Sequence, residues 1–172
     1  MANIILKACR RLHAELPTQR KLEELTWARI FDFAIRDSEW FRRQSLNPGR
    51  WAIGFPGLYI LFRTLSEMKP QSILEFGLGE SSKLTFQYAS HYPGTQLTIV
   101  EHDPEWRDVF CRTVFDAGES VRVLPLDIEG NGKNRHCSYR GLIPAVSGKK
   151  YDLAVIDGPW GRGGIRATRF WT

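Results

Sequence analysis

The pattern of apolar and polar positions changes near residue 70. Before it, apolar residues recur every three or four positions among charged ones in residues 3–16, 21–43 and 58–68. This spacing is typical of amphipathic helices with one buried face. We therefore predict three helices, which form an N-terminal helical segment over residues 1–69 that packs on the core rather than a separate domain.

After residue 70, short apolar runs alternate with helical stretches and turns. The predicted strands are residues 72–76, 96–100, 121–125 and 153–156, and the predicted helices are residues 81–90 and a helix that Asp103 caps and Pro104 begins. Strands that alternate with helices favour a parallel sheet covered on both faces. The expected fold class is therefore α/β, a Rossmann-like doubly wound parallel sheet over residues 70–172.

Two features limit the predicted sheet. Residues 129–150 are rich in Gly, Asn and Lys and predict a long irregular connection. Only 15 residues follow Asp157, whereas a further strand–helix–strand unit needs about 30. We therefore expect a sheet truncated after its fourth strand, with an edge that a homo-oligomer or a missing C-terminal segment would cover.

Acidic residues and glycines gather where the predicted strands end. Glu75 and the loop 77–82 close the first strand, Glu101 ends the second, Asp127 follows the third and Asp157 ends the fourth. Ligands of doubly wound sheets bind at these carboxyl ends. A carboxylate at the end of the second strand can accept hydrogen bonds from ribose hydroxyls, and one after the third can accept from an adenine amino group. The pattern therefore predicts one shared pocket.

Three strings carry a resemblance to a known family. They are residues 76–81, 101–106 and 151–161, and they resemble the class I S-adenosylmethionine-dependent methyltransferase superfamily, most closely its glucuronoxylan O-methyltransferase family with a polysaccharide-biosynthesis domain. The sequence departs from that family at His102, Gly158 and Trp160. The resemblance implies S-adenosyl-L-methionine as cofactor and the following binding residues: Glu75, Gly77, Leu78, Gly79, Ser81, Glu101, His102, Asp127 and Asp157.

The same resemblance implies an activity. It predicts methyl transfer to a hydroxyl of a sugar or another small-molecule acceptor, with Asp157 and His102 as the candidate bases. Asp157 could also hold a divalent metal, and no other metal-ligand spacing is evident. Two alternatives stay open: an NAD-dependent oxidoreductase, because Gly77, Gly79 and Ser82 nearly fit a dinucleotide fingerprint, and a truncated, non-catalytic domain that binds a cofactor or a partner.

Composition narrows the class of protein. The chain has 172 residues, of which 42% are hydrophobic and 25% charged, so it is expected to form a globular domain. It contains no apolar run long enough to span a membrane and no basic leader, and its three cysteines are far apart. We therefore expect a soluble cytoplasmic protein. The basic excess of residues 1–69 alternates with acids, which makes nucleic acid an improbable partner.

Overall fold

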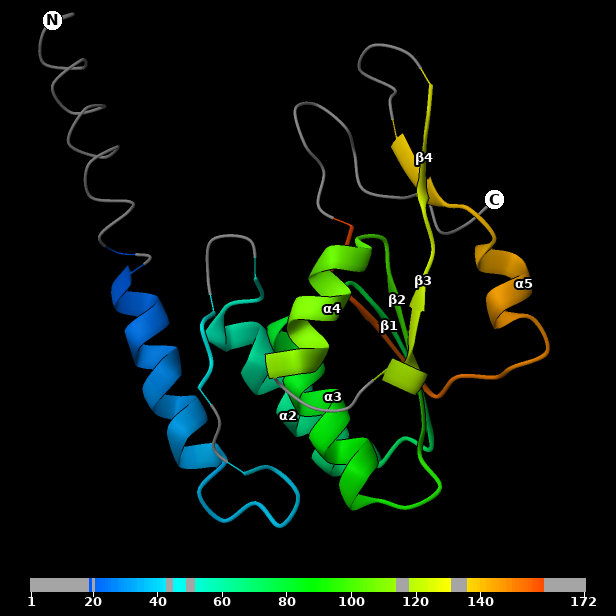
Figure 1. Cartoon of the computed structure of the whole chain (residues 1–172). Coiled ribbons are helices and arrows are strands. Elements are labelled where there is room, and N and C mark those ends of the chain that lie inside the picture. The colour runs from blue at the N-terminus through cyan, green and yellow to red at the C-terminus, as the bar shows by residue number, and fades with distance from the viewer. Residues whose placement is uncertain are drawn as a thin grey trace, which may run out of the picture.

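The computed structural model describes residues 19, 21–42, 45–48, 52–113, 118–130 and 136–159 (Figure 1). The helix predicted at residues 3–16 and the tail from residue 160 lie outside the described residues.

Four parallel strands form the main sheet. They are β1 (Ser72–Phe76), β2 (Gln96–Glu101), β3 (Val121–Val123) and β6 (Leu153–Ile156), in the order β3-β2-β1-β6. All four lie where the sequence predicts them, and the α/β class with a parallel sheet is confirmed. The chain moves outward from β1 to β3 and then returns to the other side of β1. The strand order therefore reverses between β1 and β6, which is where open α/β sheets bind ligands.

Helices cover one face of this sheet. They are α2 (Phe55–Met68), α3 (Glu80–His91), α4 (Pro104–Thr113) and an unlabelled helix over residues 21–34 (Figure 1). Their apolar sides share a core with the sheet, in which Leu58, Leu65, Ile73 and Leu84 are fully buried. The Asp103 carboxylate accepts hydrogen bonds from the N–H groups of Glu105 and Trp106, so it caps α4 as predicted.

The helix predicted at residues 21–43 is too long. The structure ends it at residue 34, and a turn follows. The Ser38 hydroxyl accepts the Phe41 N–H at 2.9 Å, a local bond that competes with continuation of the helix. The turn directs Trp40 and Phe41 into the core, where both are buried.

The opposite face of the sheet is covered by elements that the sequence did not predict. Strands β4 (Leu126–Glu129) and β5 (His136–Tyr139) form an antiparallel hairpin, and the short helix α5 (Leu142–Val146) follows. The long connection predicted over residues 129–150 is therefore not irregular throughout, because residues 136–139 form a strand and residues 142–146 a helix. Cys137 and Tyr139 alternate with polar neighbours and are buried, Tyr139 against the sheet, which gives β5 the two-residue period of a strand.

Strand β6 occupies an edge of the sheet in the part of the chain that the structure describes. Its Ile156 side chain is 56% exposed. Within the described residues, no helix has the length and apolarity needed to cross a membrane.

Candidate functional site

Glu75 is the buried centre of the candidate site. Its side chain is fully buried at the end of β1, on the face that α3 covers. Three hydroxyls of the first turns of α3 reach its carboxylate: Ser81 at 2.5 Å, Ser82 at 2.9 Å and Thr85 at 2.6 Å. Burial raises the pKa of Glu75 to about 7, although these hydrogen bonds oppose the shift. Ser82 also accepts the Gly79 N–H at 3.0 Å, so it caps the start of α3 while it holds this acid.

The two glycines of the loop between β1 and α3, Gly77 and Gly79, differ in backbone conformation and in the space around them. Gly77 has a φ of +92°, and a Cβ there would lie 2.9 Å from the Gly158 nitrogen, so only glycine fits. Gly79 is extended, and a Cβ there would meet no atom within 4 Å. The loop backbone at Gly79 therefore faces open space that a ligand could enter.

Glu101 holds the same loop from the end of β2. Its side chain is buried, and its Oε2 atom accepts the Leu78 N–H at 2.8 Å. Its Oε1 atom accepts the N–H groups of His102 and Asp103 at 2.7 and 2.9 Å. Burial opposes ionisation, but the hydrogen bonds from the His102 ring and these amides prevail and lower the pKa of Glu101. Glu101 is therefore an ionised acid that joins the loops after β1 and β2.

His102 is directed at Glu101. Its Nδ1 atom lies 2.8 Å from Oε1 of Glu101, and this carboxylate raises the pKa of the imidazole against the opposing effect of burial. The Nδ1 atom of His102 is therefore engaged by the Glu101 carboxylate. This geometry favours Asp157 over His102 as the candidate base.

Trp106 is a site residue that is not among the residues predicted from the sequence. Its indole N–H donates to the Leu78 carbonyl at 2.7 Å. Both peptide groups of Leu78 are thus held, one by Glu101 and one by Trp106. The two residues are 28 positions apart in the sequence, so no local signal indicated this contact.

Asp157 completes the cluster from the end of β6. Its N–H donates to the Phe76 carbonyl at 2.9 Å, and its carboxylate lies 3.5 Å from the Ser81 hydroxyl that also reaches Glu75. Burial raises the pKa of Asp157, opposed by hydrogen bonds from the Ile53 N–H and the Ser81 hydroxyl. Two carboxylates therefore share one serine at the point where the strand order reverses.

Asp127 lies apart from this cluster. It sits on the β4–β5 hairpin, and its carboxylate oxygens lie 3.0 and 2.9 Å from Nε of Arg140. The hydrogen bonds described thus link Glu75, Leu78, Ser81, Glu101 and Asp157 to one another, directly or through the glycine loop, and leave Asp127 paired elsewhere. Within the described residues, no group of three or more His, Cys, Asp or Glu side chains is arranged to hold a metal ion.

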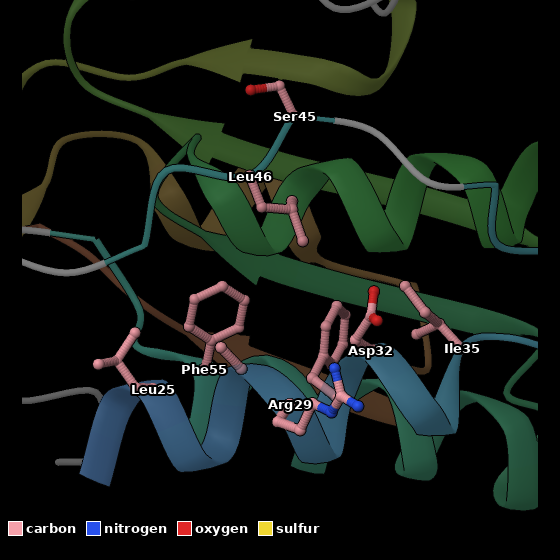
Figure 2. A pocket seen from close by; sticks show the side chains of 9 residues that line it. Leu25, Arg29, Asp32, Ile35, Ser45, Leu46 and Phe55 are labelled. Carbon is pink, nitrogen blue, oxygen red and sulfur yellow. The ribbon is translucent and has the colours of Figure 1, made fainter. Parts of the chain in front are cut away.

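A separate cavity of about 470 Å³ lies between the helix at residues 21–34 and the chain that follows it (Figure 2). It is lined by Leu25, Ala28, Arg29, Phe31, Asp32, Ile35, Ser45, Leu46 and Phe55. None of the predicted site residues lines it.

Comparisons with protein-family models, with curated proteins and with solved structures found no match to this chain. The resemblance to a methyltransferase family therefore stays a prediction, and the site is interpreted from its own geometry.

Proposed function

We propose that the chain binds S-adenosyl-L-methionine at the carboxyl ends of β1, β2 and β6 and transfers its methyl group to a hydroxyl of a saccharide or another small acceptor. The observation that carries the proposal is the convergence of Glu75, Glu101 and Asp157 on one glycine loop, at the reversal of strand order.

The residues present fit this cofactor. Gly79 presents its backbone to open space, which allows close approach of a ligand. Oε2 of Glu101 accepts one described N–H, so it retains a lone pair for a ribose hydroxyl. Glu75 and Asp157 supply negative charge for the cationic methionine end. Asp127 contributes to this fit only if its pair with Arg140 opens.

The chain's own residues would then have distinct tasks. The bound cofactor supplies an electrophilic methyl carbon on its sulfonium. Glu101 and Trp106 fix the loop that orients it, and orientation is the main requirement of a displacement reaction. Asp157 accepts the proton of the acceptor hydroxyl, because burial raises its pKa and makes it a stronger base than an ordinary aspartate.

Ser82 favours a methyl donor over a dinucleotide. It stands where a dinucleotide-binding loop has its third glycine. Its hydroxyl donates to Glu75 at 2.9 Å and accepts the Gly79 N–H at 3.0 Å. The side chain is therefore part of the loop's hydrogen bonding rather than a tolerated replacement for glycine.

Calorimetry with S-adenosylhomocysteine and with NAD tests the proposal. We expect the homocysteine ligand to bind the intact chain and NAD not to bind. Gly79→Ala should weaken binding by about ten-fold or more, equivalent to about 1.4 kcal/mol, without loss of thermal stability, because its Cβ enters open space. Ser90→Ala, at an exposed position near the far end of α3, is the matched control and should leave affinity unchanged.

Absence of S-adenosylhomocysteine binding to the intact chain would overturn the proposal, and binding of NAD alone would replace it with the oxidoreductase. Transfer itself is tested with a labelled methyl donor and a panel of sugars. Asp157→Asn should abolish incorporation, because the amide cannot accept the proton, and it should weaken S-adenosylhomocysteine binding far less than it reduces incorporation.

A further inference from the structure

The chain that leaves the helix at residues 21–34 runs along one face of α3. We call its described residues 42, 45–48, 52 and 53 the strap. Three hydrogen bonds join it to α3: the Arg42 N–H to Oε1 of Gln87 at 2.7 Å, the Lys83 ammonium to the Ser45 carbonyl at 2.9 Å, and the Asn47 N–H to Oε2 of Glu80 at 2.8 Å. Gln87, Lys83 and Glu80 are four and three positions apart, so they lie on one side of the helix.

Lys83 is the buried anchor of these contacts. Its residue is only 8% exposed, and burial of an ammonium is costly unless the charge is paired and hydrogen-bonded. Its Nζ atom is 2.8 Å from Oε1 of Glu80 and donates to the strap at Ser45. Glu80 uses its other oxygen for Asn47. The ion pair therefore has one strap contact on each partner.

The strap borders the candidate site at two points, through Asn47 and through Ile53. Glu80 directly follows Gly79, whose open side is where a ligand could enter. At the other point, the Ile53 N–H hydrogen-bonds to Asp157.

Packing from the opposite side of the strap is incomplete. Ser45 and Leu46 line the cavity of about 470 Å³ that separates them from the helix at residues 21–34 (Figure 2). Figure 2 shows both residues above this helix, with the Phe55 side chain at the level between. Leu46 and Ile53 of the strap pack against the core, and the polar contacts to α3 add to this packing.

We infer that Glu80 and Lys83 are positioning residues, which hold the strap as a wall of the ligand site beside Gly79 and set ligand affinity through it. This inference rests on the proposed function for the identity of the ligand. The two residues would act without touching the reacting atoms. Their effect is expected on affinity and on the strap, and not on the core of the sheet.

The test combines amide hydrogen exchange with calorimetry. In Lys83→Met, which keeps the length of the side chain and removes its charge, we expect exchange at Asn47 to accelerate and S-adenosylhomocysteine affinity to fall, each by about five- to ten-fold. Lys83→Arg restores a cation with several donors and should recover most of both. Glu80→Gln is the second variant and should resemble Lys83→Met, because it removes the other charge of the pair.

Glu67→Gln is the matched control. It removes one partner of the exposed pair with Arg63 on α2, away from the strap, and should change neither readout. Suppose that the wild type binds S-adenosylhomocysteine. If Lys83→Met and Glu80→Gln then both leave Asn47 exchange unchanged, or both leave affinity unchanged, the inference about the strap is overturned but the proposed function is not. A wild type that binds none would overturn the proposed function, whereas the exchange rates, which need no ligand, would still show whether the pair holds the strap.

Discussion

Replacement of Glu75 by glutamine isolates the free-energy effect of one buried acid. The substitution keeps the shape of the side chain and an oxygen that can accept from Ser81, Ser82 or Thr85. It removes the ability to ionise. Because Glu75 is fully buried and close to Asp157, ionisation there opposes folding.

The sign and size of the effect follow from the pKa. Burial raises the pKa of Glu75 from 4.5 to about 7, so between these values the folded chain binds more protons than the unfolded chain. Its contribution to stability is therefore fully present below about pH 4.5 and is lost as the pH rises to about 7. At about 1.4 kcal/mol for each unit, the loss between about pH 5 and pH 8 is about 2 to 3 kcal/mol.

Urea unfolding of the two chains at about pH 5 and about pH 8 measures this quantity. The useful number is the change in unfolding free energy with pH in the wild type, minus the same change in Glu75→Gln. Other titrating groups near the site, such as His102 and Asp157, remain in both chains and largely cancel. We expect the wild type to lose about 2 to 3 kcal/mol more than the variant over this range.

Equal pH dependence in the two chains would refute the reasoning. It would mean that Glu75 ionises as readily in the folded chain as in the unfolded one, and hence that its three hydroxyl partners compensate fully for burial.

Two further predictions concern the glycine loop. Gly77→Ala should destabilise the chain by about 1 to 3 kcal/mol, because it combines a positive φ with a Cβ only 2.9 Å from the Gly158 nitrogen; a thermal melt that matches the wild type would contradict this. Trp106→Phe keeps an aromatic ring, although a smaller one, and removes the hydrogen bond to the Leu78 carbonyl. It should cost about 1 kcal/mol in urea unfolding and weaken S-adenosylhomocysteine binding; a stability unchanged from the wild type would show that the bond contributes nothing.

Local sequence signals predict the elements of the main sheet well. The apolar runs that become β1, β2, β3 and β6 have turns or helical stretches on either side, and the Asp103-Pro104 start of α4 is a strong local signal. Once the strands are predicted, the gathering of the acids that end them can be predicted too, because parallel strands bring their carboxyl ends to one edge of the sheet.

Contacts between distant residues could not be predicted in this way. Nothing local indicates that Ser81 and Ser82 bind Glu75, since a serine at a helix start commonly serves as a cap. Ser82 does both, because its hydroxyl also accepts the Gly79 N–H. The pair between Asp127 and Arg140 depends on the register of the β4–β5 hairpin. A tract rich in Gly, Asn and Lys makes that hairpin hard to predict, because among its described residues only Cys137 and Tyr139 are buried.

The charge balance of the site favours a particular orientation of the ligand. Glu101 is compensated by three backbone N–H groups and the His102 ring. From the described residues, Glu75 receives three hydroxyls, and Asp157 receives the Ile53 N–H and a long contact from Ser81. A cation brought beside these two acids would offset the cost of their burial. The methionine end of the cofactor carries positive charge and its ribose carries none, so the charges favour the methionine end at Glu75 and Asp157 and the ribose at Glu101.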